Sequence, residues 1–166
     1  MASPVGRLGI EFHGAKVAAI VVQPSRSEAK HYKPIHKVKM TDFLLEALGR
    51  LSEYFVSVRQ DPEIEVDLRA ASLDEFSQRV FTEVQRIPYG RTWTYKRLAE
   101  ASGLRDGHNL VRSVLSSNPI PILIPCHRVT PNKGGAGAWI AGTKKKEKLL
   151  RIERKGELAG IAVTHG

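Results

Sequence analysis

The only cysteine of the chain, Cys126, is followed directly by His127 and Arg128. The thiolate is the reactive form of cysteine, and nearby cationic or basic groups lower the thiol pKa from its usual value of about 8.5. His127 is a candidate base, acting directly or through one water, and Glu153 is the candidate carboxylate that fixes the tautomer of His127. The alternative is a buried, inert cysteine, because cysteine is among the most buried residue types. The residue types alone leave both interpretations open.

Composition excludes several classes of protein. The 166 residues are 42% hydrophobic and 26% charged, which is ordinary for a globular chain and argues against a fibre or a disordered tail. One cysteine forms neither an internal disulfide nor a multi-cysteine zinc site. No apolar run approaches the ~20 residues that span a bilayer, and residues 1–4 do not begin a secretory signal. We therefore expect a soluble protein, cytoplasmic or nucleoid-associated, with no membrane partner.

The net charge of +9 is unevenly distributed along the chain. Residues 1–71 hold 10 Lys and Arg against 9 Asp and Glu, whereas residues 72–166 hold 16 against 8. An excess of this kind favours a polyanionic partner, most often nucleic acid, because each neutralised phosphate releases counterions. A solvated basic face that only confers solubility is the equally weighted alternative.

The first 71 residues read as a small α/β domain with a structural role. Residues 8–12 and 17–22 are β-rich runs on either side of a short turn, which predicts a hairpin. Apolar residues from 43 to 55 recur at helical spacing, with Thr41 as the expected N-cap. Residues 64–68 alternate apolar and acidic side chains, which predicts a half-exposed strand.

Residues 72–166 read as a second, mainly α-helical domain. Ser72 and Glu75 form a capping-box pattern before a helix that ends near Pro88. Two short helices, 95–101 and 108–117, flank a glycine-containing turn, as in a helix-turn-helix.

Three further segments complete the second domain. Residues 120–124 lie between prolines, which predicts a rigid, extended, buried loop that delivers Cys126. Glycines from 134 to 142 predict a loop around Trp139, and residues 144–155 predict a closing helix. That helix opens with three lysines, 144–146, which either contact phosphates or form a solvated face.

The segment from Asn118 to Val129, Asn-Pro-Ile-Pro-Ile-Leu-Ile-Pro-Cys-His-Arg-Val, resembles the active-site segment of the O6-alkylguanine-DNA alkyltransferases. Tyr95 lies 31 residues before the cysteine and Glu153 lies 27 after it, as in that family. The stretch from Pro88 to Tyr95 is similar to the family's entry into its helix-turn-helix. The resemblance covers residues 76–153; in the first half little beyond residues 3–8 is similar.

The resemblance implies a fold and an activity. The N-terminal domain would be ribonuclease H-like, with a small sheet and a helix, and the C-terminal domain would be a winged helix-turn-helix. The protein would act as a monomer, rotate an alkylated guanine out of double-stranded DNA and move the alkyl group from O6 to Cys126. Extrusion is required because the base stack hides the reacting atom, and it costs a few kcal/mol. One molecule is consumed per lesion, without metal or organic cofactor.

The resemblance also assigns roles to single residues. Cys126 is the nucleophile, His127 is its base through a water, and Glu153 orients His127. Asn118 braces the turn before the active-site loop, or else only ends a helix. Tyr95 assists base rotation and donates a hydrogen bond, or else only caps a helix. The implied base pocket is lined by Leu115, Pro121, Val129, Trp139 and Ile140. The implied DNA contacts are Arg105, Asn109, Arg112, Ser116 and Arg128.

The sequence departs from the family pattern on the DNA side. Asn109 stands where the family has an arginine that fills the gap left by the base, so Arg105 and Arg112 are candidate substitutes or phosphate contacts. Arg112 itself replaces a small residue that lets the helix approach the minor groove. In the pocket, Trp139 replaces a tyrosine and Ile140 replaces a serine. These changes predict altered lesion preference or altered docking.

Three other functions remain as alternatives. A non-enzymatic protein that binds alkyl lesions and flags them typically lacks the cysteine, so Cys126 counts against it. A winged-helix transcription regulator fits the charge but leaves the cysteine motif unexplained. A cysteine hydrolase needs an oxyanion hole, and no glycine pattern beside Cys126 indicates one.

Overall fold

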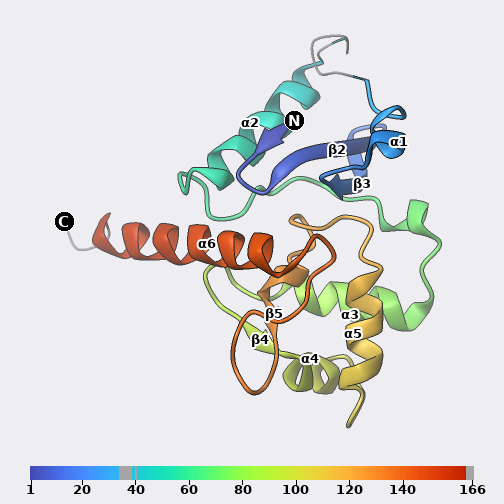
Figure 1. The fold of residues 1–166 in the computed structure, drawn as a ribbon, viewed down its shortest axis with the longest axis vertical. Coiled ribbons are helices and arrows are strands. Elements are labelled where there is room, and N and C mark those ends of the chain that lie inside the picture. The colour runs from blue at the N-terminus through green and yellow to red at the C-terminus, as the bar shows by residue number, and fades with distance from the viewer. Residues whose placement is uncertain (34–38, 40, 164–166) are drawn as a thin grey trace.

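The structure is a computed structural model that describes residues 1–33, 39 and 41–163 (Figure 1). Its N-terminal half holds an antiparallel sheet in the order β1-β2-β3, formed by Ala2–Ser3, Gly6–His13 and Lys16–Val22. His13 pairs with Lys16, so the turn consists of Gly14 and Ala15, with Gly14 at a φ of +60°. The predicted hairpin is confirmed.

The helices of this half follow the sheet. The short α1 (Arg26–Ala29) is followed by α2 (Asp42–Phe55), and the Thr41 side chain accepts a hydrogen bond from the Leu44 amide at 3.3 Å. That N-cap was predicted from the sequence. The apolar face of α2 buries Ala47, Leu51, Tyr54 and Phe55.

The predicted strand over residues 64–68 is wrong. Val66 forms only an isolated parallel bridge with Val17. The Asp67 side chain then accepts from the Arg69 amide and starts the 3₁₀ helix η2 (Leu68–Ala71). A local side-chain cap therefore ends the extended segment before a ladder can grow.

The C-terminal half is mainly helical. The cap of α3 (Glu75–Gln85) is Asp74, which accepts from the Ser77 amide at 2.7 Å, and not the predicted Ser72, which sits at a φ of +48°. Aspartate N-caps as well as serine does and lies nearer the helix. The remaining elements are β4 (Trp93–Thr94), α4 (Tyr95–Ala101), α5 (His108–Ser116), η3 (Cys126–Arg128), β5 (Val129–Thr130) and α6 (Thr143–Val163).

The two halves share one core. Figure 1 shows α6 running between the N-terminal sheet and α2 on one side and α3, α4 and α5 on the other. Buried apolar side chains from both halves form a single cluster. The Ile20 amide donates to the Pro119 carbonyl at 2.9 Å, which ties β3 to the loop before the cysteine. The division after Ala71 stays a prediction.

Within the described residues, none of the helices combines the length and the apolar character needed to cross a bilayer.

Candidate active site

Asn118 braces the loop that carries Cys126. Its amide nitrogen donates to the Ile124 carbonyl at 3.0 Å, and its oxygen accepts from the Ile120 amide at 3.0 Å. The side chain is 2% exposed, so these bonds do not compete with water. The predicted burial of the proline-bounded loop is confirmed, since Ile120, Ile122 and Ile124 are at most 2% exposed. The predicted extended conformation is wrong: the Ile124 amide donates to the Ile120 carbonyl at 2.9 Å and closes a tight turn before η3.

Cys126 is 2% exposed and its sulfur accepts a hydrogen bond from Trp139. The indole Nε1 lies 3.1 Å from Sγ. Burial raises the pKa of the Cys126 thiol, while hydrogen bonds from Asn118 and Trp139 and the charge of Lys146 act in the opposite direction. The resting sulfur is therefore a thiol at neutral pH, and its activation requires a base.

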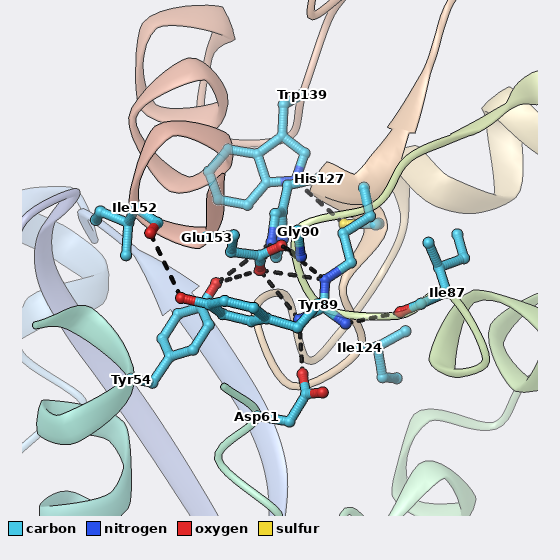
Figure 2. Close-up of polar contacts among 12 residues, drawn as sticks. Tyr54, Asp61, Ile87, Tyr89, Gly90, Ile124, His127, Trp139, Ile152 and Glu153 are labelled. Atoms are coloured by element: carbon cyan, nitrogen blue, oxygen red, sulfur yellow. Dashed lines mark hydrogen bonds and ion pairs between the residues drawn. The ribbon is translucent and has the colours of Figure 1, made fainter. Parts of the chain in front are cut away.

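His127 and Glu153 form a fully buried pair. The distance from His127 Nε2 to Glu153 Oε1 is 2.7 Å (Figure 2). Burial opposes ionisation of Glu153, but His127 and Arg128 outweigh it and hold the carboxyl pKa at about 2. The ionised carboxylate only accepts, so the proton is on Nε2. His127 Nδ1 has no hydrogen-bond partner among the described residues, and burial lowers the imidazole pKa, so Nδ1 is a free base.

Arg128 does not lie on the surface, so the predicted DNA contact is wrong. Its side chain is 2% exposed, and Nε lies 3.1 and 3.0 Å from the two oxygens of Glu153. The guanidinium also donates to the Ile87 carbonyl at 2.8 Å and to Asp61 at 2.6 Å. A buried carboxylate needs a cationic partner, and Arg128 fills that role for Glu153, so its guanidinium is not available to DNA.

Tyr54 reaches the same carboxylate from α2 and is the first functional residue that sequence reasoning missed. Its hydroxyl donates to Glu153 Oε1 at 2.7 Å and lies 3.3 Å from His127 Nε2. Figure 2 shows the phenol entering the cluster from the N-terminal half. At helical spacing Tyr54 reads only as a core aromatic, and no local motif distinguishes it.

Lys146 is the second residue that sequence reasoning missed. It is 1% exposed, whereas the lysine run was expected to be either a phosphate contact or a solvated face. Its Nζ donates to the Val129 carbonyl at 2.5 Å and the Ala138 carbonyl at 3.4 Å. Burial lowers its pKa to about 8. The ammonium thus ties β5 to the loop that carries Trp139.

A cavity of about 200 Å³ opens onto Cys126. Among the predicted pocket residues, Leu115, Trp139 and Ile140 line it, together with Tyr95. Pro121 and Val129 are buried and are not part of its lining. The remaining lining residues are Arg112, Ser116 and Ala138.

Two of the predicted DNA contacts therefore face the cavity. Arg112 and Ser116 lie on α5 and are exposed. Arg105 and Asn109 are exposed as well but lie outside the lining. A larger cavity of about 600 Å³, between the sheet and α2, contains none of the residues of the cysteine motif.

The arrangement suits nucleophilic chemistry by a thiol with a buried base. Across the described ranges, no cluster of three or more His, Cys, Asp or Glu side chains could hold a metal ion. The reacting groups that the structure offers are the thiol of Cys126, the imidazole of His127 and the phenol of Tyr95 at the cavity wall.

Comparisons with known proteins agree on one family. Residues 75–155 match the family model described as 6-O-methylguanine DNA methyltransferase, DNA binding domain. The chain is 35% identical over 117 residues to a methylated-DNA–protein-cysteine methyltransferase of Mycolicibacterium paratuberculosis, covering 70% of this chain and 69% of that protein. It is 30% identical over 154 residues to the protein of that name from Mycobacterium tuberculosis, covering 92% and 88%. The crystal structure of Mycobacterium tuberculosis OGT in complex with DNA superposes with a TM-score of 0.79 at 28% identity, covering 94% and 91%.

Proposed function

The chain belongs to the O6-methylguanine-DNA methyltransferase family, and we propose that it repairs O6-alkylguanine in double-stranded DNA by taking the alkyl group onto Cys126. The observation that carries this function is the sulfur of the only cysteine at the wall of a 200 Å³ cavity. Behind it lies the buried pair of His127 and Glu153, 2.7 Å apart. The protein is a single-turnover DNA repair methyltransferase.

The transfer is a displacement at the alkyl carbon. A bond forms between Sγ of Cys126 and that carbon, the bond from the carbon to guanine O6 breaks, and its electron pair stays on the guanine. The developing negative charge requires a hydrogen bond or a proton in the pocket. The phenol of Tyr95 lies at the cavity wall and supports that role. The thioether product has no leaving group that water displaces easily, so each molecule reacts once.

The thiol proton passes to His127 Nδ1, directly or through one water. Support comes from the raised pKa of the Cys126 thiol, which makes a base necessary, and from the unpartnered Nδ1. Glu153 then stabilises the imidazolium through Nε2. The indole N–H of Trp139 stabilises the thiolate at 3.1 Å.

The DNA-binding face proposed here is the exposed side of α5. Arg112 and Ser116 join this face to the cavity, and Asn109 lies one turn earlier on the helix. The excess of eight positive charges in residues 72–166 supports sequence-independent attraction to phosphates. A guanine swung out of the stack would enter the cavity from this side.

Several finer features belong to the same proposal. They are the ribonuclease H-like character of residues 1–71, the winged helix-turn-helix character of residues 72–166, a monomeric state and a cytoplasmic or nucleoid-associated location. The hairpin with one long helix, and α4 and α5 packed across a short turn, support the first two.

Intact-protein mass spectrometry tests the function. After incubation with duplex DNA containing O6-methylguanine, the protein should gain the mass of one methylene, located at Cys126 by peptide mapping. The Cys126→Ala variant, which leaves the cavity wall in place, should bind the duplex and gain nothing. An unchanged mass of the wild type together with tight lesion binding would favour the non-enzymatic alternative.

A further inference from the structure

We infer that Tyr54, from the N-terminal half, is a positioning residue for alkyl transfer: its phenol donates to Glu153 and reduces the negative charge that this carboxylate presents to Nε2–H of His127, so that Nδ1 stays unprotonated and able to take the thiol proton. This inference rests on the proposed function. It gives the N-terminal half a part in the reaction, whereas the sequence predicts only a structural role for it.

The direction of the hydrogen bonds follows from the carboxylate. Glu153 is ionised and cannot donate, so at 2.7 Å the hydroxyl proton of Tyr54 points at Oε1. The lone pairs of the phenol oxygen then face His127 Nε2, 3.3 Å away. The proton on Nε2 lies between two acceptors, the carboxylate at 2.7 Å and the phenol oxygen. If the proton were on Nδ1 instead, the lone pair of Nε2 would face the lone pairs of the carboxylate oxygen and the phenol oxygen, without a hydrogen between them.

Both carboxylate oxygens of Glu153 already accept several hydrogen bonds, so the carboxylate is poorly placed to take up a proton. Oε1 accepts from Tyr54, His127 and Arg128, and Oε2 accepts from Arg128 and from the Gly90 amide at 3.2 Å. A carboxylate with several donors is a weak base. When His127 becomes an imidazolium, Glu153 therefore stabilises the charge without removing the Nε2 proton.

The phenol is held in place by packing and remains protonated. Tyr54 is 0% exposed, and its ring meets the edges of Phe55 at 5.3 Å and Tyr89 at 6.1 Å between centroids. Burial, followed by the charge of Glu153, raises the pKa of Tyr54 well above 10. The hydroxyl therefore stays protonated at neutral pH and donates to Glu153.

A second contact from the same half supports the cluster. Asp61, in the segment that follows α2, accepts from Arg128 Nη2 at 2.6 Å, and its side chain is 49% exposed. The bond fixes the far end of the guanidinium whose near end holds Glu153. In Figure 2, Tyr54 and Asp61, both from the N-terminal half of the chain, lie on the same side of the buried group that contains His127 and Glu153.

Loss of the hydroxyl has a definite effect on the base. The charged and titratable groups that act on His127 are Glu153, Arg128 and Lys146, with the phenol of Tyr54 in contact. Without the phenol donor, more negative charge remains on Glu153 to stabilise the imidazolium. The pKa of His127 then rises, and the base is protonated up to a higher pH.

The test is the single-turnover methyl transfer rate of Tyr54→Phe, measured as a function of pH with saturating O6-methylguanine duplex. We expect an acid limb moved to higher pH by about half a unit or more, a transfer rate about threefold or more lower on that limb, and unchanged duplex affinity. The matched control is Tyr89→Phe, which removes a hydroxyl from the same ring cluster. That hydroxyl donates to the Ile152 carbonyl at 3.4 Å and does not touch Glu153. The control should keep the wild-type plateau and acid limb.

A measurement on the unmodified protein tests the same point without mutation. Nitrogen-15 chemical shifts of His127 should report the Nε2–H tautomer between pH 6 and 8. Observation of the Nδ1–H tautomer overturns the inference. So does a Tyr54→Phe profile equal to that of the wild type, or equal slowing of both phenylalanine variants. If the wild type itself takes up no methyl group, the proposed function fails instead, which the mass measurement distinguishes.

Discussion

The two sides of Cys126 differ in the burial of their polar side chains and in how these side chains are paired. Behind the sulfur, His127, Glu153, Arg128 and Tyr54 are 0–2% exposed and joined by hydrogen bonds of 2.7–3.3 Å. In front of it, on α5, Asn109, Arg112 and Ser116 are exposed. Arg112 has no ion pair within the part of the chain that the structure describes.

This difference separates the functions of the two sides. A buried charge is tolerable only when it is paired, so the interior side is fixed before any substrate arrives. An exposed arginine is already solvated and gains its partner when phosphates approach. Changes behind the sulfur should therefore alter stability and rate, whereas changes in front should alter DNA affinity and its dependence on salt.

The largest effect is expected from Glu153→Gln. It leaves the buried Arg128 without its main counterion and His127 without an anionic partner. Breaking a buried pair in this way costs about 3–5 kcal/mol of unfolding free energy. Denaturant unfolding should show this loss, and methyl transfer should fall below detection. If Glu153→Gln is as stable as the wild type, the buried side of Cys126 does not set the stability of the protein, and the contrast between the two sides fails.

The second prediction concerns acid unfolding. The carboxyl pKa of Glu153 is lowered from 4.5 to about 2, so its ionisation stabilises the folded state above pH 4.5 and this contribution is lost as the pH falls toward 2. A shift of that size corresponds to about 3 kcal/mol. Unfolding free energies measured between pH 6 and 2 should decline steeply in this window. Glu153→Gln should flatten that part of the decline.

The third prediction concerns Trp139, which lies between the buried side and the exposed side of Cys126 because it contacts the sulfur and also lines the cavity. Trp139→Phe keeps an aromatic wall but removes the N–H that lies 3.1 Å from Sγ. A hydrogen bond to a charged acceptor contributes about 1.5–3 kcal/mol, so the transfer rate should fall by roughly tenfold or more. The pKa of Cys126, followed by thiolate absorbance, should rise at the same time. A slower rate with an unchanged thiol pKa would mean that the indole acts only on the guanine.

The smallest effects are expected in front of the sulfur. Arg112→Ala should weaken duplex binding severalfold and reduce the slope of log affinity against log salt by about one. Asn109→Arg should strengthen binding to lesion-containing duplex. Fluorescence anisotropy at several salt concentrations measures both, and thermal unfolding should be unchanged. If Arg112→Ala lowers the transfer rate at saturating DNA more than it lowers affinity, this arginine acts on the extruded base.

Local sequence signals predicted the elements that are stabilised locally. The hairpin of β2 and β3, the Thr41 cap of α2 and the burial of the proline-bounded loop before Cys126 were all anticipated. Predictions were wrong where two local signals competed, as at Ser72 and Asp74. The strand over residues 64–68 was wrong because a strand depends on a partner that the segment itself does not specify.

The side chains whose roles changed are those with two chemical uses. Arg128 and Lys146 are cations that serve equally well at a surface or against a buried acceptor, and only the position of Glu153 and of the Val129 carbonyl selects the second use. Tyr54 is an aromatic that either fills the core or offers its hydroxyl, and here it does both.

By itself, the sequence determined the reacting thiol, its adjacent imidazole and the distant carboxylate, because a transferable motif needs only residue types at fixed spacing. Tertiary structure decided which groups surround them. Tyr54 lies 99 residues from Glu153 and Asp61 lies 67 from Arg128, and such separations carry no local periodicity. Once folding brings these side chains together, they form hydrogen bonds, because buried polar groups that are excluded from water must find partners within the protein.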